Sequence, residues 1–403
     1  MQTLPAEQAN ILERAAAAPM LEQTLAWAAV NSGTANLAGL ATVAGHLADA
    51  FSALPGDLRL LDADTVEAVA ADGAVSTSPR GRNLHLAVRP QAPVQLLLTG
   101  HMDTVYPADH AFQASRTLDD GRINGPGVAD MKSGLAIILA ALRAVEASPL
   151  APRLGYEVVI NSDEETGSHG SAALIAAAAR GKAAALTYEP AATPDGQLAG
   201  ARPGSGNFSI VVTGRSAHAG RNPQDGRNAI LAAADLALRL ADGIAPGLSV
   251  NPAKIEGGGP NNVVPDHAIL RVNLRPTTPA DEARAKTLIA ETIAAVAARH
   301  DVAIHAHGGF ARPPKPIDPA ALRLFELVRD CGARLGQPIA WAASGGVCDG
   351  NNIAACGVPV VDTMGARGGA IHSPAEFLIP ESLAERAMLS TLVLLRLAEK
   401  GRP

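Results

Sequence analysis

The 403-residue sequence has few cysteines and no excess of basic residues. Its three cysteines, Cys331, Cys348 and Cys356, have the spacing of neither a zinc ribbon nor a disulfide framework, so we expect reduced, structural thiols. A net charge of −6 offers no basic surface for nucleic acid. We therefore expect the partners to be small molecules or a second copy of the chain.

The sequence also lacks long apolar runs. None reaches the roughly 18 residues that suggest a membrane span. An export signal is unsupported, because Glu7 and Glu13 precede the first basic residue, Arg14, and Glu22 interrupts the alanine-rich stretch that follows. We expect a soluble, cytoplasmic protein with no membrane partner. Aromatic residues make up only 3% of the chain, but a hydrophobic share of 47% suffices for a core of alanine, leucine, valine and isoleucine.

Four short apolar runs are followed by histidine or acidic residues. They are Val94 to Thr99 before His101 and Asp103, Tyr156 to Ile160 before Glu164 and Glu165, Ala183 to Tyr188 before Glu189, and Val358 to Val361 before His372. Such runs, bounded by Gly, Pro or Asn, are typical of buried strands in an α/β sheet. Functional crevices in these sheets lie beyond the carboxyl ends of the strands. The pattern therefore predicts one polar site built from distant segments.

The order of predicted elements indicates two domains, as the chain length also does. Strands and helices alternate up to about residue 200. Helical structure is expected over 21–54, with a polar interruption at Asn31-Ser-Gly-Thr, and over 133–147. The order then becomes β-α-β-β-α-β, which is typical of a ferredoxin-like module: strand 208–212, helix 226–240, strands 248–256 and 268–274, helix 278–299 and strand 302–307. The proline-rich segment Arg312-Pro-Pro-Lys-Pro is interpreted as a return linker, and residues 319–335 as a helix. We predict a first domain of residues 1–203 and 313–403, interrupted by an inserted domain of residues 204–312.

The polar residues near the strand ends have the chemistry of a metal site. Nitrogen and oxygen ligands that suit zinc come from His101, Asp103, Asp130, Glu164, Glu165, Glu189 and His372. Two dications would be offset by three carboxylates and a bridging hydroxide, which favours a binuclear site. Adjacent side chains at a strand end point in different directions, so one of Glu164 and Glu165 can bind metal while the other takes a proton from water. Asp103 could accept the second N–H of His101.

Other histidines and glycines have simpler interpretations. By itself, His218 in Gly214-Arg-Ser-Ala-His-Ala-Gly220 predicts a surface loop, and His305 and His307 predict solvated side chains on a strand. Gly125-x-Gly127 lacks the third glycine of a dinucleotide fingerprint, so we predict no nucleotide cofactor.

Six motifs together resemble a known family along nearly the whole chain. They are His101-Met-Asp-Thr-Val, Gly125-Pro-Gly-Val-Ala-Asp130-Met-Lys-Ser-Gly, Asp163-Glu-Glu-Thr-Gly-Ser, Tyr188-Glu189-Pro, Gly214-Arg-Ser-Ala-His218 and His372-Ser-Pro. The set resembles that of the co-catalytic zinc metallopeptidases, which include glutamate carboxypeptidases, acetylornithine deacetylases, succinyl-diaminopimelate desuccinylases and aminoacylases. The resemblance implies an α/β, mixed-sheet zinc-peptidase catalytic domain with an inserted ferredoxin-like lid and dimerisation domain.

The resemblance also implies roles for individual residues. One zinc would be held by His101, Asp130 and Glu189, and the other by Asp130, Glu165 and His372, with Co²⁺ or Mn²⁺ as substitutes. Glu164 would be the general base, Asp103 the partner of His101, and Asp130-Met131 a cis peptide bond. His218 would stabilise the oxyanion, in its own chain or in the partner chain of a homodimer formed through the inserted domain.

The same resemblance implies a substrate class. Asn262 and Arg275 would grip a free carboxylate, and Glu189 favours the glutamate carboxypeptidase and deacylase branches. The loop from Ser344 to Asn351 departs from the usual pattern, because Cys348 stands where Ser or Thr is more common. We predict a di-zinc hydrolase that releases C-terminal glutamate from N-acyl or peptidyl substrates. An N-acyl-amino-acid deacylase or a dipeptidase is the alternative, and a binding module without turnover is the third hypothesis.

Overall fold

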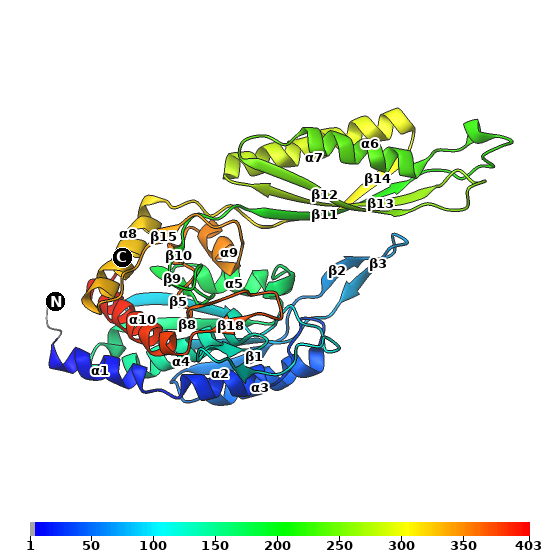
Figure 1. Cartoon of the computed structure of the whole chain (residues 1–403). Helices are drawn as coiled ribbons and strands as arrows, with labels where there is room; N and C mark the ends of the chain where they lie inside the picture. The colour runs from blue at the N-terminus through cyan, green and yellow to red at the C-terminus, as the bar shows by residue number, and fades with distance from the viewer. Residues whose placement is uncertain (1–4) are drawn as a thin grey trace.

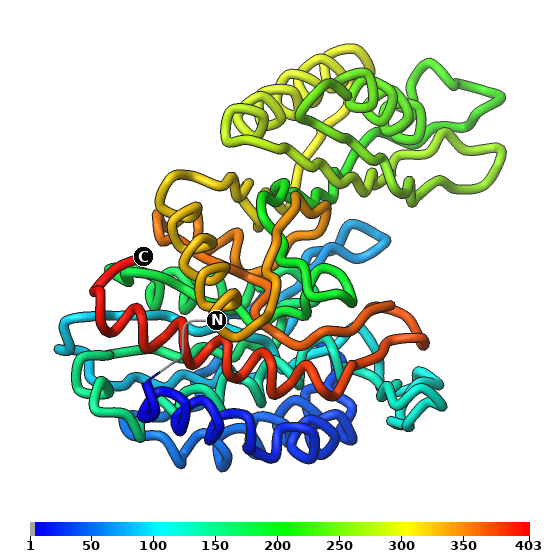
Figure 2. The backbone as a smooth tube through the Cα atoms, turned by 60° about the vertical axis from the view of Figure 1, so that its left-hand side comes forward, coloured from blue at the N-terminus to red at the C-terminus, as the bar shows by residue number. Residues whose placement is uncertain are grey.

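Two lobes make up the computed structural model, which describes residues 5–403 (Figure 1). Residues 1–4 of the predicted first domain lie outside the described residues. The larger lobe is built from both ends of the chain, and the smaller lobe from the segment between them, as the colours of Figure 2 show. The predicted α/β class with a mixed sheet is confirmed. Within residues 5–403, no helix is both long and apolar enough to cross a membrane.

A six-stranded mixed sheet forms the centre of the larger lobe, in the order β1-β4-β8-β5-β9-β16. Its strands are β1 (Asp57–Leu61), β4 (Asn83–Val88), β5 (Val94–His101), β8 (Leu154–Asn161), β9 (Ala184–Thr187) and β16 (Val360–Val361). The last four run parallel, whereas β4 is antiparallel to β8 and β1 is antiparallel to β4. The parallel strands are buried on both faces, which explains why they appear in the sequence as continuous apolar runs.

Helices cover this sheet (Figure 1). They are α1 (Ala6–Ala16), α2 (Met20–Ala28), α3 (Leu37–Phe51), α4 (Ser133–Glu146), α5 (Ala172–Ala179), α8 (Pro319–Arg334), α9 (Asp349–Ala355) and α10 (Glu381–Lys400). The predicted helix over 133–147 is thus observed, and the one over 21–54 is interrupted between α2 and α3. Helix α4 is buried along almost its whole length and packs against α10 and α1. Because α10 follows the inserted segment, the core of this lobe joins both ends of the chain.

Short strands complete the larger lobe. They are β2 (Val66–Val69), β3 (Val75–Ser78), β6 (Arg116–Thr117), β7 (Ile123–Asn124), β10 (Leu198–Ala199), β15 (Trp341–Ala342), β17 (Gly368–Gly369) and β18 (Phe377–Leu378). A small sheet has the order β17-β18-β7-β6, β10 pairs with β15, and β2 pairs with β3 in a hairpin.

The smaller lobe, which we call the lid, is an antiparallel sheet backed by two helices. Its elements are β11 (Ser205–Thr213), α6 (Ala229–Asp242), β12 (Leu248–Gly257), β13 (His267–Pro276), α7 (Pro279–His300) and β14 (Ala303–Arg312). The strand order is β12-β13-β11-β14, and α6 and α7 cover the sheet face away from the larger lobe (Figure 1). A separate apolar cluster fills the lid and includes Leu270, Val272 and Leu274 of β13. The boundaries at residues 204 and 312 stay a prediction.

The β2–β3 hairpin projects from the larger lobe towards the lid sheet (Figure 1). Glu67 Oε1 lies 2.8 Å from His307 Nδ1 on β14, and Arg271 Nη2 on β13 donates to the Val69 carbonyl at 2.9 Å. The hairpin therefore holds the lid at a third place, in addition to the two chain connections.

Candidate metal centre

The ends of three adjacent parallel strands bring the first ligand candidates together. β5 lies between β8 and β9, and His101 is its last residue. Glu164 and Glu165 begin a short 3₁₀ helix, Glu164–Thr166, just beyond β8. Glu189 lies two residues beyond β9. All four side chains are largely buried, with His101 only 1% exposed.

Asp130 lies between two histidines. Its Oδ1 is 3.1 Å from His101 Nε2, and its Oδ2 is 3.3 Å from His372 Nε2. It belongs to a distorted turn, Val128–Lys132, that leads into α4, and the Asp130-Met131 peptide bond is cis, as expected. The Glu376 carboxylate fixes this turn by accepting hydrogen bonds from the backbone N–H groups of Gly127, Ala129 and Asp130 at 3.0–3.2 Å. Sequence reasoning missed Glu376, although it lies only four residues after His372.

His372 does not follow a strand of the central sheet directly, so that part of the sequence interpretation was wrong. The run that precedes it, β16, ends at Val361, and the next residue, Asp362, forms buried ion pairs with Arg202 and Lys315. His372 lies instead in the turn between β17 and β18. There its Nε2 lies 3.1 Å from Glu165 Oε2.

The residues present fit a pair of divalent cations. Ligand atoms gather into two groups: His101, Asp130 and Glu165 in one, and His101, Glu164 and Glu189 in the other. Glu189 Oε2 lies 3.7 Å from His101 Nε2, while the buried Oε1 has no hydrogen-bond partner among residues 5–403. Such an orphaned oxygen needs a cation or a donor. Imidazole nitrogens and carboxylate oxygens at this spacing are a donor set that zinc accepts.

The electrostatics of the cluster agree with that fit. Burial raises the pKa of Glu189 to about 8 and that of Glu165 to about 7. Hydrogen bonds to Asp130 and Glu165 raise the pKa of His372 to about 11. Burial acts against ionisation of Asp130 as well, but His101 and His372 outweigh it and hold its pKa below the usual range. Without cations, several acids here would bind protons at neutral pH.

Asp103 links His101 to the turn that carries the two glutamates. Its carboxylate accepts the backbone N–H groups of Glu164 at 3.1 Å and Glu165 at 3.2 Å, and the Thr34 hydroxyl at 2.6 Å. Asp103 Oδ1 also lies 3.3 Å from His101 Nδ1, which is 3.1 Å from the Asp103 carbonyl oxygen. Asp103 therefore orients a potential ligand and the adjacent glutamates together.

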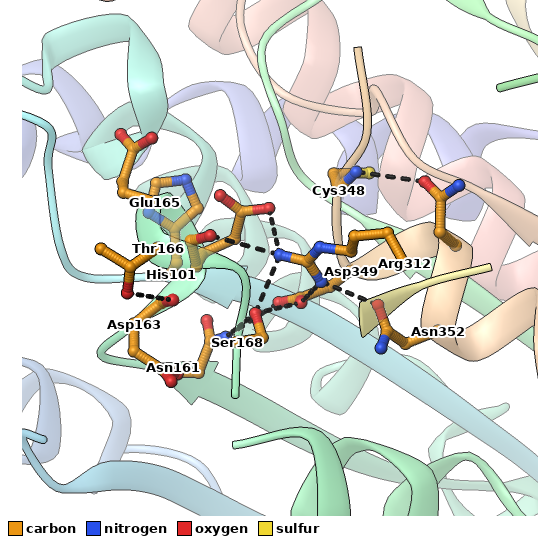
Figure 3. A network of polar contacts seen from close by, with 12 residues as sticks. His101, Asn161, Asp163, Glu165, Thr166, Ser168, Arg312, Cys348, Asp349 and Asn352 are labelled. Carbon is orange, nitrogen blue, oxygen red and sulfur yellow. Dashed lines mark hydrogen bonds and ion pairs between the residues drawn. The ribbon is translucent and has the colours of Figure 1, made fainter. Parts of the chain in front are cut away.

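Glu164 is held by a buried arginine that sequence reasoning missed. Arg312 Nη2 lies 2.7 Å from Glu164 Oε1, and its guanidinium also contacts Ser168, Asp349 and Asn352 (Figure 3). The segment that begins at Arg312 connects β14 to α8, as a return linker does, but the Arg312 side chain is only 3% exposed. Burial raises the pKa of Glu164 to about 8, although Arg312 opposes that shift. The sequence around Arg312 gives no sign that its side chain is buried, because an arginine next to several prolines is usually exposed.

Of the three lid residues that the sequence predicts for the site, Arg275 alone lines a cavity with these acids. It lines a cavity of about 740 Å³ together with Glu164, Glu165 and His372. His218 and Asn262 are exposed, line neither cavity that contains these acids, and lie on loops that contact each other through an Ala219 N–H to Asn262 O hydrogen bond of 2.9 Å. His307 pairs with Glu67 and His305 is exposed, so neither is near the ligand groups described for residues 5–403.

This fold and these clustered ligands define a two-lobed metallohydrolase. Residues 97–396 match the model of Peptidase family M20/M25/M40, and the chain belongs to this family. It is a hydrolase of the metallopeptidase type, and the family binds two metal ions.

Individual relatives have different activities. Carboxypeptidase G2 from Pseudomonas sp. (strain RS-16) is 29% identical over 325 residues, 79% of this chain and 77% of that protein. Succinyl-diaminopimelate desuccinylase from Xanthomonas oryzae pv. oryzae (strain PXO99A) is 32% identical over 324 residues, 75% and 83% of the two chains. A tripeptidase structure from Staphylococcus aureus shares the fold with a TM-score of 0.71 and 24% identity, and covers 96% of this chain and 98% of its own.

Proposed function

We propose that the protein is a di-zinc hydrolase that cleaves the amide bond to an amino acid with a free α-carboxylate, with C-terminal glutamate as the first candidate. One observation carries this proposal: Asp130 lies between two histidines, and the buried Glu164 shares a cavity with the lid residue Arg275. The similarity to carboxypeptidase G2 supports glutamate release.

Two sets of residues would hold the metal ions. His101, Asp130 and Glu189 form one set, and Asp130, Glu165 and His372 form the other, with Asp130 shared. When bound, two zinc ions polarise a carbonyl group and lower the pKa of a nearby water, and Co²⁺ or Mn²⁺ would serve the same purpose.

The chain's own side chains would then divide the chemistry. Arg275 binds the α-carboxylate, because a guanidinium matches the planar shape of that group. Glu164 accepts the proton of the attacking water and passes it to the leaving nitrogen. Arg312 keeps the Glu164 carboxylate in one orientation. Asp103 holds His101 in place.

A second candidate is an N-acyl-amino-acid deacylase. The similarity to the desuccinylase favours it, because that relative is 32% identical. The same residues would carry out the same chemistry, and only the pocket that receives the acyl group would differ.

A substrate panel is expected to distinguish these activities. Enzyme loaded with zinc should release free amino acid from N-acyl and dipeptide substrates, and enzyme stripped by a chelator should lose nearly all of that activity. The measurement is the free amino acid, with metal added back as the control. Preferential release of glutamate supports the carboxypeptidase assignment, whereas release of other amino acids supports a deacylase or dipeptidase. Equal rates with and without metal would contradict the proposal.

We further propose that two chains pair through their lids and that His218 serves the partner's site. His218 Nδ1 accepts the backbone N–H groups of Gly220 and Arg221 at 3.1 Å, so its proton lies on Nε2 and faces outward as a donor. That N–H could stabilise the negative charge on the carbonyl oxygen in the transition state. The lid also exposes Leu231 (59%) and Leu238 (68%) on α6, and β12 is an edge strand.

Mixed dimers should reveal this exchange. His218→Ala and Glu164→Gln chains are each expected to be nearly inactive alone, because each lacks one member of every site. In a heterodimer purified with two different tags, one of the two sites is intact, so about half of the wild-type activity should return. A His218→Ala homodimer that keeps full activity, or a heterodimer that stays inactive, would contradict donation between chains.

A further inference from the structure

A second cavity adjoins the metal centre. Its volume is about 420 Å³, and it shares Glu164, Glu165 and His372 with the cavity that Arg275 lines. Arg202 lines only the second cavity, and Arg275 lines only the first. Arg275 Nη1 donates to the Gly345 carbonyl at 3.0 Å, in the same loop that Arg202 contacts from this second cavity. If Arg275 holds the α-carboxylate and the scissile amide lies between the shared residues, the acyl group must extend into the cavity of Arg202.

Buried charges behind this cavity do not cancel. Arg202 makes a bidentate ion pair with Asp362 through Nε at 2.7 Å and Nη2 at 3.1 Å, and Lys315 Nζ lies 3.0 Å from the same carboxylate. The exposed fractions of these three side chains are 7%, 0% and 3%. Burial alone would raise the pKa of Asp362, but Lys315 and Arg202 outweigh it and keep the carboxyl ionised. Two cations and one anion leave one positive charge.

Neighbouring groups do not remove that charge. Burial raises the pKa of the Cys348 thiol well above its ordinary value, so this cavity residue stays neutral. Glu189 is the other carboxylate whose charge acts on Arg202, and it belongs to the proposed metal centre, where a cation would offset it. Serine or threonine, which is more common at position 348, would be neutral as well, so the charge does not depend on the cysteine.

The cavity also has unused donors beside the charge. Nη1 of Arg202 donates to the Gly346 carbonyl at 3.1 Å and to Ser344 Oγ at 3.4 Å. Together with the two bonds to Asp362, this uses four of the five N–H groups of the guanidinium. Ser344 Oγ accepts from Arg202 and from the Gly346 N–H, and its own proton has no acceptor among residues 5–403. One N–H and one O–H therefore remain for a ligand.

We propose that this cavity binds a carboxylate on the acyl group of the substrate, through Arg202 and Ser344, with Lys315 supplying the surplus charge. The preferred substrates are then amides formed between a dicarboxylic acid and an amino acid. This inference rests on the proposed amide hydrolysis and narrows its substrate class. It also gives a role to a lysine that is only 3% exposed and lies behind the cavity wall, where it pairs with Asp362.

The test compares substrates that differ by one charge. N-succinyl-L-glutamate and the matching N-succinamoyl-L-glutamate have the same shape, but the second has a neutral amide at the far end of the acyl group. Zinc-loaded enzyme should show a kcat/KM at least about tenfold higher for the acid, as expected for one partly buried charge contact. Lys315→Met should lower that ratio about tenfold, because Arg202 and Asp362 then cancel. Ser344→Ala should lower it by a smaller factor.

A matched control is available in Lys182, which is 8% exposed and pairs with Glu157 at 2.6 Å just before β9, at the opposite end of the sheet. Lys182→Met should leave the ratio of the two rates unchanged. N-acetyl-L-glutamate reports on the proposed function separately. If the enzyme hydrolyses N-acetyl-L-glutamate but shows no preference for N-succinyl- over N-succinamoyl-L-glutamate, the inference is overturned and the proposed function stays intact.

Two further outcomes are decisive. Equal losses on both substrates in Lys315→Met would show that the lysine only supports the fold, which overturns the inference. If no substrate is cleaved, the proposed function fails. The cavity assignment is then tested by the dissociation constants of the acid and of its neutral amide, measured by calorimetry on the zinc-loaded enzyme. Tighter binding of the acid that is lost in Lys315→Met supports the cavity assignment, and equal binding overturns it.

Discussion

Glu164→Gln is expected to lower kcat by about 10²–10⁴-fold, the usual contribution of a general base, while both metal ions remain bound. Glutamine has nearly the same shape and can still accept the hydrogen bond from Arg312 Nη2, which lies 2.7 Å from Glu164 Oε1. It cannot take a proton from water. The measurements are kcat on the best substrate of the panel and the metal content by mass spectrometry.

The metal content separates two roles for this side chain. Glu164 also lies in a possible ligand group with His101 and Glu189. Loss of one metal ion together with activity would make Glu164 a ligand, and near-normal turnover with two ions bound would exclude it as the base. Glu157→Gln is the control, because Glu157 lies on β8, the strand before Glu164, but pairs with Lys182.

Asp130→Ala is expected to cost the enzyme both metal ions and, with them, nearly all activity. The two carboxylate oxygens face different histidines, at 3.1 Å and 3.3 Å, so the substitution removes a ligand from each set at once. Removing an outer-shell partner of a ligand lowers metal affinity roughly 10–100-fold, and removing a ligand itself is expected to lower the affinity further. Titration with zinc should therefore show both affinities reduced.

His372→Ala provides the comparison for that result. This residue contacts Asp130 and Glu165 but lies in only one of the proposed sets, so one ion should remain tightly bound. If Asp130→Ala also kept one ion at wild-type affinity, the shared position of Asp130 would be refuted. Circular dichroism of both variants would show whether the fold is intact.

Much of the architecture could be predicted because burial leaves a plain pattern. The runs that became β5, β8 and β9 are apolar along their length, since helices cover both faces of a parallel sheet. Strand β13 could be predicted because buried and partly exposed side chains alternate in it from Leu270 to Arg275. The proximity of His101, Glu164, Glu165 and Glu189 followed from the rule that parallel strands end on one edge.

Other features depend on contacts between segments that are far apart in the chain. Arg312 and Glu164 are separated by 148 positions, and nothing local shows that this arginine is buried. His372 reaches the centre through the small sheet of β17 and β18, whose two-residue strands are too short to leave a periodic pattern. The contact of the β2–β3 hairpin with the lid likewise depends on how the lobes are placed, which local sequence does not specify.

Because the larger lobe is built from both ends of the chain, the two lobes become complete at different times during synthesis. A nascent chain that has reached Arg312 contains every strand and helix of the lid, with its own apolar cluster, but lacks β16, α10 and His372. Domains generally fold as units and from the N-terminus during synthesis. The lid can therefore complete its core while the larger lobe still waits for its last helix. The proposed set of metal ligands is complete only after His372 has left the ribosome, so loading of both proposed metal ions would be among the last steps of maturation.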